Sequence, residues 1–452
     1  MKTYSAGIAS ALAIGLAVTS QAEARPITEE EAIALREEIT RLKSRVEDLE
    51  KRLVESTEQA EPQAAGRPRE EPRIEWKGSP RIAEGDRSFK VKGRIQADAN
   101  YVSVPSGLDD KGLGFSSEFR RVRLGGEGEL GSGFGYKLEA EFSDNGVDLV
   151  DTFLTYRTGG WLLTLGNHNQ FQSLDELTGD TTGSFMERAA FTDAFNFERR
   201  LGFSAQYQNG PFLGQFGIFT DDVEALSNQN DGPEGGDENN SFSTDGRVVY
   251  APRLGSTQLH FGASAHWRKL GRLSDAPLRY RQRPFVHSAN SRLIGTAALS
   301  VREELSYGVE LAAISGRWHA AAEMHWLRPD RLDGATPDFR GGYAEIGYFL
   351  TADSRAYGNG FFGNTRPGNP LGKGGIGALQ VNLRYDHLDL DSKDIRGGIQ
   401  NGYLASLIWT PIQYLRFNLN YGYLDYQGAV PLIDGRTDYG VHVFGSRFEL
   451  DF

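Results

Sequence analysis

Hydrophobic and polar residues alternate strictly over residues 89–101. Val91 and Ile95 belong to an apolar set, and Lys90 and Lys92 belong to a polar, mostly basic set. Because successive side chains of a β-strand point to opposite faces, this segment predicts a strand with one apolar and one polar face. Soluble sandwiches alternate as well, but here the pattern returns repeatedly up to the end of the chain. Such repetition is typical of a transmembrane β-barrel with lipid outside and a wet interior.

Sixteen alternating segments can be counted, and bacterial barrels have an even number of strands. Short turns such as Gly131-Ser132-Gly133 alternate with long polar connections, except that the long connection over 351–375 falls on the side of the short turns. A short apolar run, 293–301, is assigned to a loop. The sequence thus predicts an all-β fold, a sixteen-stranded antiparallel transmembrane β-barrel over residues 88–452. The segments are 89–104, 115–130, 134–143, 147–157, 161–168, 199–209, 212–220, 242–251, 257–268, 305–315, 317–328, 341–350, 376–388, 398–410, 413–426 and 439–452.

The first part of the chain has a different character. Residues 1–24 contain one Lys near the start, an apolar run and the sequence Ala22-Glu23-Ala24, which is the pattern of a secretory signal peptide. Cleavage would leave Arg25 as the first residue. Residues 59–87 are rich in Pro and charge, and we expect a flexible linker there.

Between these segments, residues 25–58 have a seven-residue apolar period flanked by Glu, Arg and Lys. The period predicts a short helical coiled coil in the periplasm, and a single amphipathic helix lying on the barrel is the alternative. Branched residues at a with Leu at d favour two strands over three, so the number of strands stays open, as does any binding to peptidoglycan. The periodic positions are Ala32, Ile39, Val46 and Leu53, with Leu35, Leu42 and Leu49 between them.

Composition excludes several classes of protein. Apolar residues form 39% of the chain, too few for a helical membrane protein, whereas 11% aromatic residues suit the girdles of a barrel. The absence of cysteine excludes disulfides and thiolate metal sites. A formal charge of −12 argues against a nucleic-acid partner.

No sequence pattern points to catalysis. The chain has no G-x-S-x-G and no H-E-x-x-H motif. His319, Glu323 and His325 share one face of a predicted strand, but residues two apart on a strand are separated by about 7 Å, so the two imidazoles are too distant to share one metal ion without other ligands. We therefore expect no enzyme, no catalytic residue, no metal and no cofactor.

Two stretches resemble the phosphate-selective porin O and P family. One is SLDELT over 173–178 with FMERA over 185–189, and the other is GYFLTADSRAY over 347–357. The resemblance covers residues 88–452 and implies a homotrimeric barrel of the bacterial outer membrane. It further implies that the third and fifth loops fold inward and that the channel passes phosphate or polyphosphate. The terminal Phe452 resembles the signature read by the barrel assembly machinery, and outer-membrane lipids and lipopolysaccharide are further expected partners.

The candidate pathway for phosphate or other small anions consists of inward-facing cations, because Arg and Lys bind phosphate oxygens well. Acidic residues face inward too, so a weakly selective diffusion porin is one alternative and an envelope-tethering barrel is another. The basic run of loop five either lines a constriction or covers the outer face. Glu187 and Arg188 are expected to anchor loop three to the wall. The pathway candidates are Lys90, Lys92, Arg94, Arg121, Arg123, Arg200, Arg247, Arg268, Arg279, Arg281, Arg283, Arg384 and Arg416.

Overall fold

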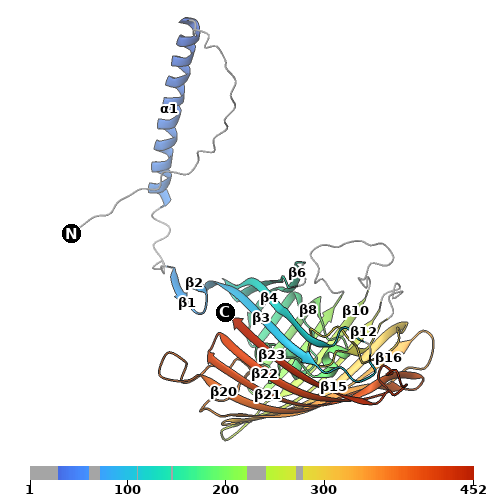
Figure 1. Ribbon diagram of the computed structural model, residues 1–452. Coiled ribbons are helices and arrows are strands. Elements are labelled where there is room, and N and C mark those ends of the chain that lie inside the picture. Colours follow the sequence, from blue (N-terminus) through green and yellow to red (C-terminus); the bar gives the residue numbers. More distant parts are fainter. Residues whose placement is uncertain (1–28, 61–71, 109, 144–145, 221–240, 271–277) are drawn as a thin grey trace. The chain divides into compact units, whose positions relative to one another are not determined.

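The computed structural model describes residues 29–60, 72–108, 110–143, 146–220, 241–270 and 278–452; the expected signal peptide, 1–24, lies outside the described residues. Sixteen long antiparallel strands form a closed wall, in which the last strand pairs with the first (Figure 1). The predicted barrel is confirmed. Its wall strands are β3 (Arg87–Val102), β4 (Gly114–Gly131), β5 (Phe134–Glu141), β6 (Asp148–Thr158), β7 (Trp161–Asn169), β8 (Arg199–Asn209), β9 (Phe212–Phe219), β10 (Phe242–Tyr250), β12 (Thr257–Lys269), β15 (Val301–Ser315), β16 (Trp318–Arg331), β17 (Phe339–Phe349), β20 (Ala378–Ser392), β21 (Ile395–Ile412), β22 (Leu415–Gln427) and β23 (Tyr439–Asp451).

A small hairpin extends the sheet before the first wall strand. Strands β1 (Arg73–Trp76) and β2 (Pro80–Glu84) pair with each other, and β2 continues the sheet alongside the start of β3. The composition of residues 59–87 predicted a flexible linker, and this prediction is wrong for the residues of the hairpin. Here Ile74 and Trp76 alternate with charged residues, a strand pattern that the neighbouring prolines concealed.

The N-terminal helix α1 (Glu29–Ala60) contains all seven periodic positions and ends two residues beyond the predicted segment, 25–58. No helix within the described residues is long and apolar enough to cross a membrane.

Pairs of aromatic side chains lie on the outer face of the barrel near the short turns. Trp161 lies 4.8 Å from Tyr207 between ring centroids, and Phe134 lies 4.6 Å from Tyr156. Another set, which includes the stacked pair Tyr307 and Trp326, lies toward the opposite strand ends. Two aromatic girdles around an apolar band are what the two interfaces of a membrane favour.

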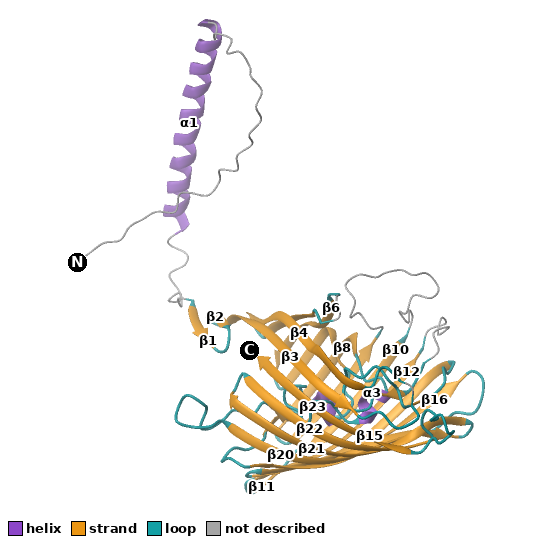
Figure 2. Ribbon diagram, in the orientation of Figure 1, coloured by secondary structure: helices purple, strands orange, loops and turns teal. Residues whose placement is uncertain are grey.

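The remaining short elements belong to connections between wall strands. Figure 2 shows α3 surrounded by strands of the wall, and it contacts β17 and β20. Residues 293–300 of the apolar run lie in the connection before β15, as expected, although two of them form a short strand and Val301 is the first residue of β15. These elements are α2 (Leu174–Leu177), α3 (Ala190–Ala194), β11 (Arg253–Leu254), β13 (Arg281–Gln282), β14 (Ile294–Gly295), β18 (Ala356–Gly358) and β19 (Phe361–Gly363).

The outer face gives the first testable prediction. Leu311 is an outward residue of β15, 53% exposed, between the two aromatic girdles. Leu311→Arg should lower the free energy of unfolding by roughly 2–4 kcal/mol, because lipid cannot solvate the guanidinium. Urea unfolding in lipid vesicles, followed by tryptophan fluorescence, measures this change. The matched control is Leu332→Arg, at a residue 62% exposed in the loop after β16, where little change is expected; equal losses for both variants would contradict the assignment of the lipid face.

Candidate channel and its constriction

The connection between β7 and β8, residues 170–198 and called loop three here, turns into the barrel. Ser173 caps α2, and its Oγ accepts hydrogen bonds from the N–H groups of Asp175 and Glu176. The backbone N–H groups of Leu174 and Asp175 donate to the carboxylate of Glu323 on β16, at 2.9 and 2.7 Å. The SLDEL motif therefore builds a tight helical turn whose first N–H groups are bound by the wall.

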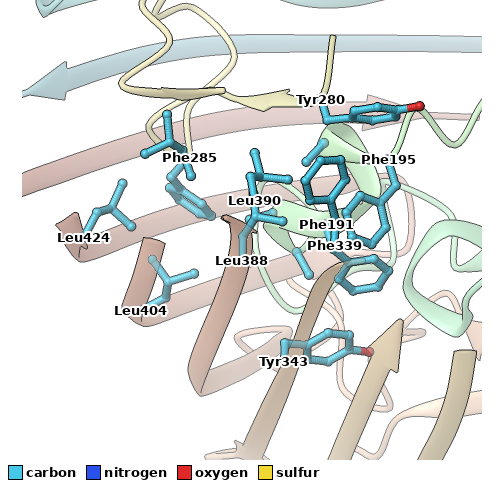
Figure 3. Packing of buried hydrophobic residues seen from close by; sticks show 14 of the residues in the cluster. Phe191, Phe195, Tyr280, Phe285, Phe339, Tyr343, Leu388, Leu390, Leu404 and Leu424 are labelled. Carbon is cyan, nitrogen blue, oxygen red and sulfur yellow. The ribbon is translucent and has the colours of Figure 1, made fainter. Parts of the chain in front are cut away.

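The second helix of loop three sits on an apolar part of the inner wall (Figure 3). Phe191 is fully buried and stacks on His325, with ring centroids 4.7 Å apart. Gly341 on β17 makes room for this contact, because a Cβ atom there would lie 2.5 Å from the Cβ of Phe191. The cluster also includes Phe195, Phe339, Tyr343, Leu388, Leu390, Leu404 and Leu424.

Glu187 and Arg188 occupy different surroundings. The Glu187 carboxylate lies 2.5 Å from Arg447 of β23 and 3.2 Å from Arg120 of β4, so it connects loop three to two wall strands. Arg188 stays within the loop, donating to the backbone carbonyls of Asp175 and Glu176. Contacts with the wall, as made by Glu187, are what anchoring of loop three requires. The anchoring role of Glu187 and Arg188 remains a prediction.

Loop five connects β12 to β15, and its described residues, 270 and 278–300, extend from that side of the wall across the lumen to β4. The hydroxyl of Tyr280 donates to Glu304 at 2.5 Å, which holds the loop near its origin. On the far side His287 lies 2.9 Å from Glu118 of β4. Arg279 and Arg281 remain exposed, whereas Arg283 is half-buried and 3.8 Å from Asp193 of loop three.

The connection between β17 and β20, residues 350–377, also enters the barrel, from the side of the short turns. Arg355 is buried, donates to the carbonyl of Thr182 and to Ser184 in loop three, and lies over the ring of Phe362. The hydroxyl of Tyr357 lies 2.6 Å from His260 Nδ1. Burial raises the pKa of Tyr357 to about 12, so the phenol stays neutral at any ordinary pH. This long connection, which was the exception to the alternation of short turns and long loops, therefore contacts loop three from the side of the short turns.

The predicted pathway arginines mostly face a carboxylate. Arg247 and Glu310, both with fully buried side chains, are 2.6 Å apart, and Gly360 provides a carbonyl acceptor for the same guanidinium. A buried charge without a partner would be strongly destabilising, so such pairing is expected where loops fill the lumen. The other pairs are Arg94 and Arg121 with Asp180, Arg123 with Glu141, Arg200 with Glu198, Arg268 with Glu304, Arg384 with Glu345, and Arg416 with Glu449.

Arg120 and Asp180 are charged residues of this network that no sequence pattern marked. Arg120 and Arg121 both point inward because of a β-bulge. Gln96 of β3 pairs with Arg121 and Ala97 pairs with Phe119, so Arg120 is the extra residue of β4. Asp180 of loop three binds Arg121 at 2.7 Å. Parity along the strand predicts only one of two adjacent side chains to face inward, and no sequence pattern marks Asp180.

Exposure divides the inner wall into two halves. On β10 to β23 the inward charged residues, such as Arg247 and Glu323, are buried beneath loop three, loop five and the β17–β20 connection. An opening between the two loops is lined by Arg120, Asp193 and Arg283, among others. Partly exposed charged residues are concentrated on β3 to β6, although Asp98, Arg121, Glu139 and Glu141 of the same strands are buried. The half-exposed charged residues there are Lys90, Lys92, Arg94, Glu118, Arg120, Arg123, Glu127, Lys137 and Asp151.

A closed barrel with an apolar outer face, a polar lumen and inward-folded loops defines an outer-membrane channel of the porin class. The chain belongs to the phosphate-selective porin O and P family, which matches residues 89–452. An uncharacterized protein of Caulobacter vibrioides is 59% identical over 450 residues, covering 94% of this chain and 91% of that protein.

Solved porin structures share the fold at low sequence identity. OmpT of Vibrio cholerae superimposes with a TM-score of 0.53 at 9% identity, covering 82% of this chain and 100% of that one. An anion-selective porin from Comamonas acidovorans gives 0.51 at 14% identity, covering 81% and 100%.

The packing of α3 against Gly341 of the wall gives the second prediction. Gly341→Ala places a methyl group against Phe191, whose Cβ cannot move without the helix, so loop three should shift and the single-channel conductance should change. Planar-bilayer recording measures this change. In the control variant Gly246→Ala, the new methyl group meets no atom within 4 Å, so its conductance should equal that of the unmodified protein. If Gly341→Ala conducts like the control, α3 does not define the channel.

Proposed function

We propose that this porin forms a passive, water-filled channel with a modest preference for small inorganic anions, phosphate among them. The observation that carries the proposal is the state of Lys90 and Lys92 on the inward face of β3. Both are partly exposed, and among the described residues neither ammonium has a carboxylate within 4.0 Å. They are therefore cations that a passing anion can approach.

The magnitude of the preference follows from the surrounding charges. Glu127 is the cross-strand neighbour of Lys90 and reduces the positive potential there. At about 4 Å in a water-filled pore a unit charge contributes roughly 1 kcal/mol, so each lysine can favour an anion at its position by about fivefold and disfavour a cation there by a similar factor. Electrostatic filtering of this size gives preference without trapping the ion.

A second candidate function, a weakly selective diffusion porin, is favoured by the balance of the paired charges. Asp151 lies between Lys137 and Arg199, while Lys137 also binds Glu139, so this group of four contains two charges of each sign. Arg120 and Arg447 with Asp98 and Glu187 form another such group. Balanced groups add little to the long-range field that separates ions.

The assembly is also part of the proposal. OmpT of Vibrio cholerae, which shares the fold, has been solved in a trimer form. We infer a homotrimer in the outer membrane, with helix α1 in the periplasm. Passage through the β3–β6 half of each barrel would then give three parallel pores.

The third prediction tests the anion preference directly. Replacing Lys90 and Lys92 together by Gln should lower the chloride-to-potassium permeability ratio several-fold, because the two accessible cations are removed. Reversal potentials across a planar bilayer in a potassium chloride gradient measure the ratio.

Two control variants test whether the permeability ratio changes in the direction that the charge predicts. Glu127→Gln should raise the ratio, because it removes the nearest acid from the same wall. Lys269→Gln, at an exposed position on the outward face of β12, should leave it unchanged. A cation preference of the unmodified protein would overturn the proposal, and a ratio near that of free diffusion would favour the diffusion porin.

A further inference from the structure

Helix α1 carries an apolar stripe that no other described residue of the N-terminal unit covers. Ile39, Leu42, Val46 and Leu49 are 49–60% exposed, and they follow one another at spacings of three and four residues. Residues at these spacings lie on one face of a helix. An isolated helix gains nothing from such a stripe in water, so a partner of similar shape is needed to cover it.

The charges beside the stripe indicate which partner fits. With Ile39 and Val46 at position a, Glu38 and Arg45 occupy position g, while Lys43 and Glu50 occupy position e. In a parallel coiled coil, a g residue faces the e residue five positions later on the neighbouring helix. If the neighbour is the same helix in the same register, Glu38 faces Lys43 and Arg45 faces Glu50. Both contacts then join opposite charges.

Other arrangements fit less well. An antiparallel pair that places Leu42 opposite Val46 would bring Lys43 of one copy against Lys43 of the other. A lipid surface with anionic headgroups favours a basic helix, whereas α1 contains ten acidic and six basic residues. The sequence of the helix is therefore complementary to itself in one orientation.

We propose that residues 38–50 of α1 form a parallel, in-register coiled coil with the same segment of further copies of this chain. The coil connects neighbouring porin subunits through their N-terminal segments, in addition to any contact between barrels. This inference stands apart from the proposed ion selectivity, because it concerns a segment outside the barrel.

Disulfide cross-linking in the full-length protein tests the proposal. The chain contains no cysteine, so an introduced cysteine can form a disulfide between two porin chains only with the same introduced cysteine of another copy. Leu42→Cys and Leu49→Cys, examined separately in outer membranes with copper phenanthroline as oxidant, should each give covalent dimers. Ser44→Cys is the matched control, because position f points away from the coil and should give at least about fivefold less dimer. Heat-dependent mobility in gels shows that each barrel is folded.

Two results would overturn the proposal. One is that neither stripe variant cross-links although its barrel is folded, or that Ser44→Cys cross-links equally well. The other is that dimers form only between chains carrying Leu42→Cys and chains carrying Val46→Cys, since that pattern belongs to the antiparallel arrangement.

A charge exchange tests the register separately. Lys43→Glu placed in the Leu42→Cys chain should lower the dimer yield by about twofold or more, because like charges then face each other. Adding Glu38→Lys should restore the yield. Failure of the second exchange to restore it would contradict the parallel register.

Discussion

The hydrogen-bonded closure between β3 and β23 is the constraint on which the rest of the structure depends. An open sheet edge in lipid would leave backbone N–H and C=O groups without partners, at several kcal/mol for each group. Closure removes the edge and fixes the direction of every side chain in the two strands. Phe448 then faces lipid opposite Ala97, and Arg447 faces the lumen opposite Asp98. All inward polar groups are thereby gathered in one enclosed space.

The same closure holds loop three. Arg447 binds Asp98 across the strand pair and donates to the Glu187 carboxylate and to the carbonyl of Met186. Gly445 on the same strand leaves room for the Met186 side chain. Because a buried guanidinium needs several acceptors, the residue that joins the two ends of the barrel also binds the segment that narrows it.

The sequence was sufficient for the wall and insufficient for the lumen. The period of two identified all sixteen strands and the inward face that carries Lys90 and Lys92, because that period follows from backbone geometry alone. It could not reveal Arg120, since a bulge breaks the parity, or the contact of Glu187 with Arg447, since 260 residues separate them. The inward course of the β17–β20 connection depends on packing against loop three, which no local pattern encodes.

The loops that fill the lumen also determine which inward arginines can interact with solute. Loop three, loop five and the β17–β20 connection cover the wall from β10 to β23, so Arg247 and Arg384 bind carboxylates and carbonyl groups of the protein instead of solute. Their positive charge is cancelled within a few ångströms, and a cancelled charge exerts little force on an ion in the pore. The number of arginines in the barrel is thus a poor guide to its selectivity. Selectivity should instead follow the few charges on β3 to β6 that remain in contact with water.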